Sequence, residues 1–352
     1  MRPGHGRIHK GYVGVMVTLV VSLFAAVWIY VAVCPMCYMD AEYPPALAKH
    51  EMVRSCDLGT VTILGDSRSG VAIAPLLMTV PTTNLSFNGG SPIEAAAVTR
   101  EMLRCPKLPR LVIVSLDALH LERPDTTLWD RSAYFHLLDV RDLQALLATS
   151  TRLHDLSAFA VAGHDGLPDE VRIWLYGARF PSIYFAALVR SGVGLRYWSN
   201  WTSLATTLRE RGHDAYDRWP LSDAVAPDAA ITQFHPLPIV DHYFDAMLGA
   251  LDAHGVDVAL LEMPVNQRTF DAMSPRVLAE MRAYFEKFQQ RYSHVHVVDD
   301  PVPHWPNAYF DDRFAHMNRK GAILYTARLD ACLRQWFDRA SADIGAGCAL
   351  AP

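Results

Sequence analysis

Beyond residue 55, short apolar runs alternate with segments whose apolar residues recur every three to four positions. The apolar runs have the length of strands, and the segments between them have the spacing of helices. Buried strands separated by helices pair in parallel, so this pattern predicts an α/β fold with a central parallel sheet covered on both faces. The expected strands span residues 61–65, 83–87, 111–116, 256–262 and 294–298, and the expected helices span 92–104, 240–254, 275–291 and 320–340.

The stretch from about 120 to 235 interrupts this alternation. It is long and rich in aromatic residues, including five tryptophans. Long unstructured loops are uncommon within compact domains, so we expect a helical insertion that covers the functional site. Its segment 171–189 is apolar with only two arginines. That composition fits a pair of core helices, and it also fits a surface that rests on a membrane or lines a groove for an acyl group or glycan.

An uncharged apolar segment of 22 residues runs from Tyr12 to Val33. As a helix it would be roughly 33 Å long, enough to cross a bilayer. A cleavable signal peptide is the rival interpretation, but its apolar part would be shorter and would end in small residues. The basic residues before the segment and the acidic residues after it predict a cytoplasmic N-terminus and a periplasmic or extracytoplasmic remainder. These flanking residues are Arg2, Arg7, Lys10, Asp40 and Glu42.

These patterns divide the chain into five parts and predict a single-pass protein of the inner (cytoplasmic) membrane. The parts are a cytoplasmic N-terminus (1–11), a transmembrane anchor (12–33), a linker (34–55), an α/β domain (56–340) with its insertion, and a flexible C-terminal tail (341–352).

Composition narrows the range of functions. The chain has 352 residues, of which 51% are hydrophobic and 20% charged, so it can bury a large core and is not disordered. Its net charge of −5 is mild, and no run of Lys or Arg follows the first ten residues. We therefore expect no nucleic-acid partner. Metal ligands at a useful spacing are also absent from the sequence, so no metal or other cofactor is expected.

Six cysteines in an outward-facing domain permit disulfides without requiring them. Cys56 and Cys105 precede the expected strands 61–65 and 111–116 by similar distances. If those strands are neighbours, the two thiols meet at one edge of the sheet and can form a bridge. Cys34 and Cys37 have the spacing of a metal or redox pair, but no second pair accompanies them, which favours simple membrane-boundary residues.

The strongest chemical signal is Ser67, in the sequence Gly-Asp-Ser-Arg-Ser-Gly (65–70) directly after the first expected strand. A serine at this position, at the start of the next helix, lies where backbone N–H groups favour a developing anion. About 245 residues later, His316 precedes the helix expected at 320–340 and could act as the base.

These residues resemble the SGNH (GDSL-type) hydrolases, and within them the membrane-anchored branch that includes the teichoic-acid D-alanylation protein and polysaccharide O-acetyltransferases. The resemblance covers about 55–120 and 240–340. It rests on Gly65-Asp66-Ser67, on the Asn-Gly-Gly at 88–90, on the order of serine and histidine, and on the Asn-x-x-Gly that follows His316. It implies a three-layer, flavodoxin-like fold, Ser67 as nucleophile, and an oxyanion hole formed by the N–H groups of Ser67 and Gly89.

The chain departs from the family pattern at the third motif. There the family has an asparagine that donates to the oxyanion, whereas this chain has Asp117. An ionised carboxylate only accepts hydrogen bonds, so Asp117 cannot stabilise an oxyanion. Either Ser67 and Gly89 suffice, or Asn88 or Asn266 supplies the missing donor. For Asp117 we favour a role in organising the neighbouring loops.

The second departure concerns the acid of the catalytic triad. The family spacing is Asp-x-x-His, but Arg313 stands three residues before His316. An arginine cannot orient the imidazole, so a carboxylate must come from another position. We choose Asp312 as the acid rather than Asp311, because Asp312 needs a turn only one residue longer than that of the family. The alternative is Asp299 or Asp300, at the end of the last expected strand.

The resemblance therefore implies a serine esterase or O-acyltransferase that acts through an acyl-serine. The expected substrates are small esters or the acyl esters of an envelope or exported polysaccharide, and the expected partners are the membrane and a membrane acyl-transfer or polysaccharide-synthesis protein. The sequence does not separate hydrolysis from transfer. The alternative is a catalytically inactive SGNH-like subunit that binds a glycan or an assembly partner.

Overall fold

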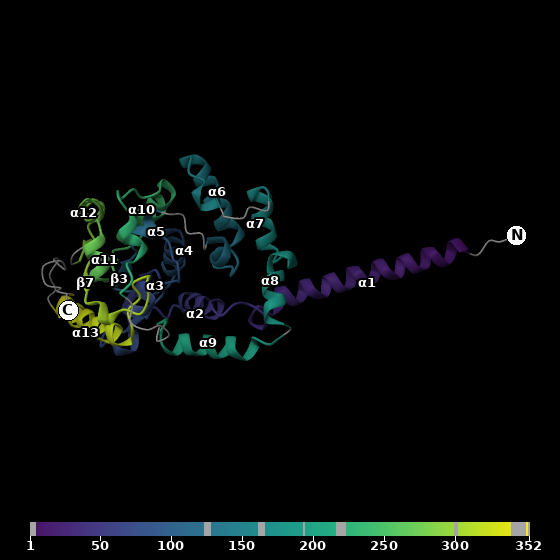
Figure 1. Ribbon diagram of the computed structural model, residues 1–352, viewed down its shortest axis with the longest axis horizontal. Coiled ribbons are helices and arrows are strands. Elements are labelled where there is room, and N and C mark those ends of the chain that lie inside the picture. The colour runs from purple at the N-terminus through teal and green to yellow at the C-terminus, as the bar shows by residue number, and fades with distance from the viewer. Residues whose placement is uncertain are drawn as a thin grey trace.

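A long helix projects from a mixed α/β body in the computed structural model (Figure 1). The structure describes residues 5–122, 128–160, 166–192, 194–215, 223–298, 302–338 and 350. The projecting helix is α1 (His5–Val33), which begins inside the segment predicted as the cytoplasmic terminus. Its portion Gly11–Val33 is long and apolar enough to cross a membrane, and almost none of that portion is buried against the protein.

The body is built on a five-stranded sheet in which all strands are parallel, as the sequence predicts. The strand order is β2-β1-β3-β4-β6. Every residue of β1 and β3 is buried, which fits strands covered on both faces. The strands are β1 (Val61–Gly65), β2 (Thr82–Asn84), β3 (Leu111–Ser115), β4 (Asp257–Leu260) and β6 (Val295–Val297).

Helices cover the two faces of this sheet in a way that follows from its strand order. The chain moves from β1 outward to β2, then returns past β1 to β3, β4 and β6. Because crossovers between parallel strands are right-handed, α3 lies on one face and α4, α10 and α12 on the other. Accordingly α3 packs on α13, and α4 packs on α10. The helices are α3 (Ser67–Ala72), α4 (Pro92–Met102), α10 (Pro238–Ala253), α12 (Pro275–Arg291) and α13 (Arg319–Asp338).

The reversal of direction between β1 and β3 creates a switch point at the carboxyl ends of these strands, where ligands bind in open α/β sheets. A second, two-stranded parallel sheet of β5 (Val265–Asn266) and β7 (His304–Trp305) lies after β4 and β6 in chain order. The short helix α11 (Gln267–Ala272) follows β5. These additions build further structure beyond the carboxyl ends of β4 and β6.

The insertion between β3 and β4 is helical, which confirms this part of the prediction. Its own core includes Tyr134 and Tyr184, and it packs against residues that follow α1, such as Tyr38. Its elements are α5 (Ala118–Glu122), the π-helical turn η3 (Leu128–Ala133), α6 (Val140–Leu153), η4 (Ser157–Phe159), α7 (Asp169–Gly177), α8 (Pro181–Ser191), α9 (Tyr197–Arg209) and η5 (Pro227–Ala230).

The segment predicted as a linker (34–55) is folded instead. It forms the turn η1 (Pro35–Cys37) and the helix α2 (Tyr43–Arg54), which packs against α9. Prolines at the start of α2 suggest a loop in the sequence, but proline is well tolerated in the first turn of a helix. Of the predicted flexible tail, only Leu350 lies within the described residues. It is buried, and its carbonyl accepts a hydrogen bond from the indole of Trp305.

Two disulfides connect described cysteines. Cys56 and Cys105 are bridged, as the prediction of neighbouring strands allows, because β1 and β3 pair in register. Cys34 and Cys37 also form a bridge, at the end of α1, rather than remaining simple boundary residues.

The core of the insertion contains a histidine that resists protonation. His136 shares a hydrogen bond with the hydroxyl of Tyr184 at 2.9 Å. Burial, with a smaller contribution from the charge of Arg179, lowers the pKa of His136 to about 4. The unfolded value is about 6.5, so between these two pH values the unfolded chain binds more protons at this residue than the folded chain.

We therefore expect the stability conferred by neutral His136 to be complete above about pH 6.5 and to be lost as the pH falls toward 4. The folding equilibrium should weaken by up to about tenfold per pH unit in this window. Thermal melts at a series of pH values measure the effect. His136→Asn is the matched variant, because asparagine tolerates the positive φ of this position and does not titrate. If the unchanged protein and His136→Asn lose stability equally at acid pH, the loss is caused by groups other than His136.

Candidate active site

Ser67 is the first residue of α3, directly after the carboxyl end of β1 at the switch point. The preceding Asp66 caps this helix, and its carboxylate accepts a hydrogen bond from the backbone N–H of Arg68 at 2.8 Å. Asp66 also accepts the backbone N–H of Asp117, which follows β3. The carboxylate before the nucleophile therefore holds together the ends of two neighbouring strands.

The structure brings the predicted Ser67, His316 and Asp312 together. Nε2 of His316 lies 2.8 Å from Oγ of Ser67, and Nδ1 of His316 lies 2.6 Å from Oδ2 of Asp312. His316 is largely buried, whereas Asp312 and Ser67 are half-buried. A hydroxyl, an imidazole and a carboxylate joined in this order form the arrangement that activates a serine nucleophile.

The turn before His316 explains how a carboxylate four residues away reaches the imidazole. Oδ1 of Asp312 accepts the backbone N–H groups of Phe314 and His316, which curls the loop around its side chain. Ala315 adopts a left-handed conformation with φ of 62°, which accommodates the extra residue. Arg313 is exposed and stacks over the ring of Phe314, so it does not enter the triad.

Asp312 is ionised in this arrangement. Burial acts to raise its pKa, but the hydrogen bond to His316, the charge of that imidazole and two backbone N–H donors together lower the pKa below its ordinary value. An ionised Asp312 holds Nδ1–H of His316, so that Nε2, which contacts Oγ of Ser67, is the nitrogen that can accept a proton. The carboxylate thus selects the histidine tautomer that a general base needs.

The loop that carries Gly89 lies against the end of β1. The backbone N–H of Phe87 donates to the carbonyl of Gly65, and Gly90 approaches that same carbonyl so closely that a side chain there would clash. Gly89 itself has φ of 64°, which favours glycine. Tight packing of this loop on Gly65 brings the predicted oxyanion donor next to the segment that leads into Ser67.

The other predicted contributors have different positions. Asn266 is buried at the start of α11, where its amide donates to the carbonyl of Ala224 and its oxygen accepts the backbone N–H of Thr269. Both ends of this amide are thus engaged in local structure, with one N–H of the amide nitrogen donated to Ala224. The other candidate for the missing donor, Asn88, lines a small cavity beside Gly89.

Asp117 organises neighbouring loops, as expected. Its carboxylate accepts hydrogen bonds from the backbone and the ring of His120, and it lies 3.4 Å from the guanidinium of Arg68. Burial acts to raise its pKa, but the charges of His120 and Arg68 and these hydrogen bonds lower the pKa well below its ordinary value. Asp117 is therefore an acceptor only, which agrees with its exclusion from the oxyanion hole.

Sequence analysis missed a buried charge network around Arg68, the residue after the nucleophile. Its guanidinium pairs with both carboxylate oxygens of Asp228, at 3.1 and 2.5 Å, and its Nε donates to the carbonyl of Phe314 at 2.9 Å. It also lies 3.9 Å from Glu262, at the end of β4. The sequence does contain a signal of this network, because Asp66, Asp117 and Glu262 each follow one of three neighbouring strands closely. It does not show that the three acids share Arg68 as a partner.

The network contains more carboxyl groups than cations. For this reason, two of its carboxyl groups, those of Asp66 and Glu262, have raised pKa values. Burial and the nearby charge of Asp117 raise the pKa of Asp66 above its ordinary value, although His120 and Arg68 oppose the shift. Burial, with the charge of Asp117, raises the pKa of Glu262 well above its ordinary value. A raised pKa favours the neutral form of the Glu262 carboxyl, which limits the negative charge beside Ser67.

Arg68 joins the helix of the nucleophile to the loop of the histidine, so we expect Arg68→Met to be strongly destabilising. The substitution leaves the carboxylates of Asp228 and Asp117 buried without their partner, which typically costs about 3–5 kcal/mol. Urea denaturation of both proteins measures the loss. The double variant Arg68→Met/Asp228→Leu should cost less than the sum of its single substitutions. Strict additivity would contradict a direct coupling between these side chains.

Asp66, Asp117 and His120 bring one potential ligand atom each within 4.8 Å of one another, and among the described residues they are the group that could hold a metal ion. The guanidinium of Arg68 lies 3.4 Å from Asp117, and His120 is bonded to Asp117 through its ring. A cation here would compete with these contacts and meet the positive charge of Arg68. The donor set therefore fits an internal ion-pair network better than a metal centre.

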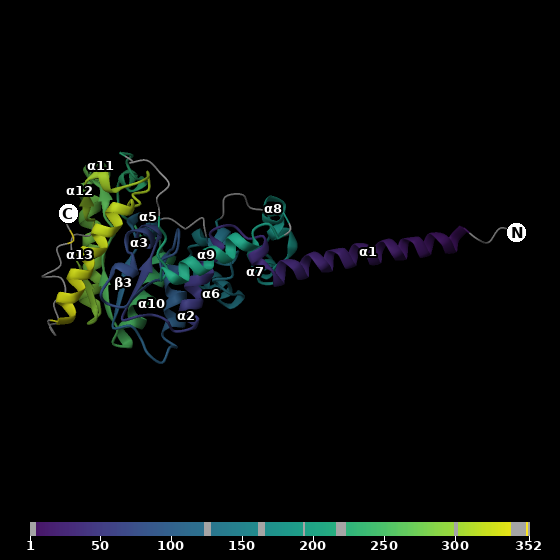
Figure 2. The ribbon, with the colours of Figure 1, turned by 90° about the horizontal axis from the view of Figure 1, so that it is seen from below.

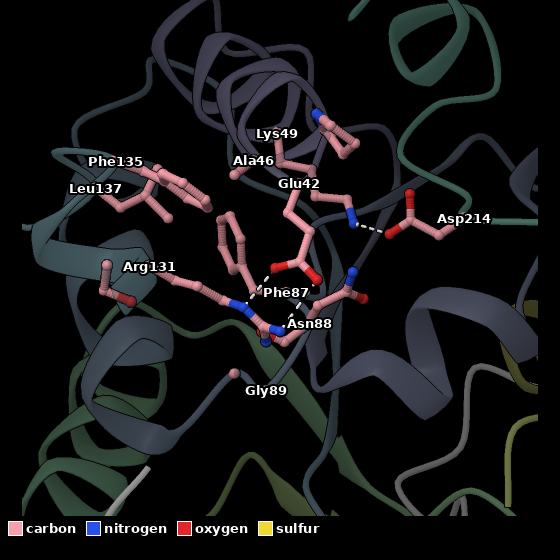
Figure 3. Close-up of a pocket in the computed structure, with 13 residues that line it drawn as sticks. Glu42, Ala46, Lys49, Phe87, Asn88, Gly89, Arg131, Phe135, Leu137 and Asp214 are labelled. Atoms are coloured by element: carbon pink, nitrogen blue, oxygen red, sulfur yellow. Dashed lines mark hydrogen bonds and ion pairs between the residues drawn. The ribbon is translucent and has the colours of Figure 1, made fainter. Parts of the chain in front are cut away.

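A small cavity lies between α2 and the loop of Gly89. Its volume of about 20 Å³ is enough for a water molecule but not for a substrate. Figure 3 shows Lys49 reaching Asp214 and Arg131 reaching Glu42 across this cavity. Lys49 is buried and also donates to the carbonyl of Ser86. These contacts fix the loop that carries Gly89 against α2.

A larger groove of about 430 Å³ lies beside α3. It begins at Val71, one helical turn after Ser67, and includes Met317, the residue after His316. Leu76, Leu77 and Ile323 give it an apolar and largely exposed surface. Ser67, His316 and Asp312 are not among the residues that line it.

No protein-family model matches the chain, and no curated protein aligns with it significantly. The case for function therefore rests on the geometry of the site.

Proposed function

We propose that the protein is a membrane-anchored serine ester hydrolase or O-acyltransferase of the SGNH type. The observation that carries this proposal is the continuous chain of hydrogen-bonding contacts from Ser67 through His316 to Asp312. Each group has the chemical character its role needs: a hydroxyl at the switch point, an imidazole with one nitrogen held, and an ionised carboxylate. The apolar groove beside Val71 supports the proposal by offering space for an acyl group or for the alcohol.

The proposed reaction has two halves. In the first, Oγ of Ser67 adds to the ester carbonyl carbon while Nε2 of His316 takes the hydroxyl proton. Backbone N–H groups of Ser67 and Gly89 stabilise the resulting oxyanion. The bond between the carbonyl carbon and the alcohol oxygen then breaks, and His316 returns its proton to the departing alcohol. The products are a free alcohol and an acyl-serine.

In the second half, an oxygen nucleophile attacks the acyl-serine carbonyl and gives its proton to His316. The bond to Oγ of Ser67 breaks, and the proton returns to that oxygen. Water as the nucleophile completes hydrolysis, and a sugar hydroxyl completes O-acyl transfer. Asp312 steadies the imidazolium in both halves without accepting its proton.

We propose that the natural substrate is the acyl ester of an envelope or exported polysaccharide, on the outer side of the cytoplasmic membrane. The basic residues before the apolar span of α1 and the acidic residues after that span support this orientation. The bridges Cys34–Cys37 and Cys56–Cys105 support an oxidising compartment. Tethering through α1 would concentrate the site where such polysaccharides emerge, near membrane proteins of acyl transfer or polysaccharide synthesis.

A fluorophosphonate probe tests the enzymatic proposal directly. The full chain should be labelled at Ser67, as identified by mass spectrometry of the modified peptide. Release of acyl groups from a synthetic ester, with and without an oligosaccharide acceptor, then distinguishes the two reactions. A product that appears only with the acceptor identifies transfer.

One observation favours a second candidate, a catalytically inactive subunit that binds a glycan or an assembly partner. Asp117 stands where the family supplies an oxyanion donor, and its ionised carboxylate cannot take that role. Failure of the probe to label a folded chain at any pH, combined with retained glycan binding, would support this alternative.

A further inference from the structure

Helices α7 and α8 form a layer across the base of α1. In the two views of Figures 1 and 2 they occupy the same narrow zone at the end of α1, and α9 runs from this zone back toward the α/β body. The contacts that tie this region to α1 include two hydrogen bonds: the indole of Trp28 donates to the carbonyl of Ala178 at 2.8 Å, and the backbone N–H of Gly194 donates to the hydroxyl of Tyr30 at 3.1 Å.

These contacts fix the level of the layer relative to a membrane. The apolar span of α1 ends at Val33, and Trp28 lies five residues earlier, which is roughly 8 Å along a helix. The ring of Phe180 contacts the rings of Trp28 and Phe24, still farther inside the span. A bilayer that covers this span must therefore reach the start of α8. Trp and Tyr near the end of a membrane helix are typical of the interface.

The two faces of α8 differ in what they contact. Tyr184 and Ala187 are buried in the core of the insertion, on the side of the α/β body. The opposite face exposes 65% of Phe185 and 65% of Val189. An apolar face turned away from the protein, on a helix that crosses the axis of the anchor, has the character of a helix that lies in a membrane interface.

The segments on either side of α8 also expose large apolar side chains. Leu195 is 80% exposed and Trp198, at the start of α9, is 78% exposed. Trp174 of α7 is 58% exposed. Apolar side chains exposed to this extent are individually unremarkable on soluble surfaces, but several on consecutive elements mark a contact surface.

We infer that this surface, which we name the collar and define by Trp174, Phe185, Val189, Leu195 and Trp198, inserts into the headgroup region of the lipid bilayer that α1 spans. Continuity with α1 identifies the lipid as its occupant, because the contacts of Trp28 and Tyr30 place the collar at the boundary of the span. This inference rests on the proposed anchoring by α1 and not on the chemistry of the active site.

Basic residues of the collar region suit the same location. The side chain of Arg190, at the end of α8, is 63% exposed, and Arg196 precedes α9. Both lie near Asp40, at 3.6 and 3.9 Å, so they are held at the level of the chain's exit from α1. Phospholipid phosphates at this level would be favourable partners for them. A domain held by α1 and the collar together has a fixed orientation and height above the membrane, unlike one that hangs from a single helix.

The test uses the full chain in phospholipid nanodiscs, with an environment-sensitive fluorophore on one introduced cysteine at a time. Native described cysteines are engaged in disulfides, so labelling is carried out on oxidised protein. Phe185→Cys and Trp198→Cys report on the collar. Leu208→Cys is the matched control, because it is 40% exposed on the same helix as Trp198 but near its other end. Val20→Cys reports on α1.

Nitroxide-labelled lipids should quench the fluorophore at 185, 198 and 20 several times more strongly than at 208. Strong quenching at 20 with only control-level quenching at 185 and 198 would overturn the collar and leave the anchor intact. Control-level quenching at all four positions would overturn both. Protection of 185 and 198 from lipid quenchers and from soluble iodide alike would identify a protein cover and also overturn the inference. Circular dichroism melts verify that each labelled variant is folded.

Discussion

Ser67→Ala is expected to abolish covalent labelling and to lower the turnover of an ester substrate by about 10⁶-fold, the typical loss when a serine nucleophile is removed. The reason is geometric: Oγ of Ser67 is the hydroxyl in contact with Nε2 of His316, at 2.8 Å. Binding of the ester should change little, because the groove beside Val71 is untouched. The measurement is kcat and KM for a chromogenic ester together with fluorophosphonate labelling.

Ser69→Ala is the matched control on the same short helix. Oγ of Ser69 donates to the carbonyl of Asp66 or to the hydroxyl of Ser86, and it is buried away from the imidazole. Its removal should reduce stability modestly, by about 0.5–1.5 kcal/mol, and leave labelling intact. Loss of labelling in Ser69→Ala but not in Ser67→Ala would show that Ser69 is the nucleophile. That result would remove the basis of the proposed mechanism.

The sheet was predictable from sequence because its strands are buried on both faces. β1 and β3 consist of continuous apolar or small residues, and no other local structure explains such short runs between helical patterns. The predicted meeting of Ser67 and His316 depends on the same logic. Ser67 begins the helix that follows β1, and His316 stands just before the helix that follows the last strands, so both were expected at the carboxyl edge of the sheet.

The helix α2 shows where local patterns mislead. Its sequence begins Tyr-Pro-Pro and mixes Lys, His and Glu with small apolar residues, which looks like a solvated linker. In the structure Lys49 is buried because its ammonium group donates hydrogen bonds to Asp214 and to the carbonyl of Ser86. Both partners are distant from Lys49 in the sequence. A buried charge of this kind is decided by tertiary partners, which no window of sequence contains.

The network of Arg68 was hidden for a related reason. Asp66 and Asp117 follow strands that sequence analysis identified, but Asp228 comes from the insertion, whose path could not be predicted. Likewise the positive φ of Ala315 is a departure from the usual preferences of alanine, and it is what allows Asp312 to reach His316. Asp312 could be chosen as the acid from chemistry alone, but the backbone conformation of its turn could not be predicted from the sequence.

Asp312→Asn is expected to lower kcat by about 10⁴-fold with little change in KM. The carboxylate accepts Nδ1–H of His316 at 2.6 Å, whereas an amide can donate to Nδ1 and so favour the tautomer whose Nε2 carries the proton. In that tautomer the nitrogen that faces Ser67 cannot act as a base. The backbone N–H groups of Phe314 and His316 can still bond to the remaining oxygen, so the loop should keep its shape.

Asp311→Asn separates this effect from general damage to the loop. Asp311 is buried beside Asp312, and its backbone N–H donates to the carbonyl of His316, a contact that the substitution leaves in place. Its kcat should therefore remain near that of the unchanged protein. If Asp311→Asn loses activity while Asp312→Asn keeps it, the acid of the triad is Asp311. If both variants keep full activity, the imidazole takes its orientation from another carboxylate, and the acid role of Asp312 is wrong.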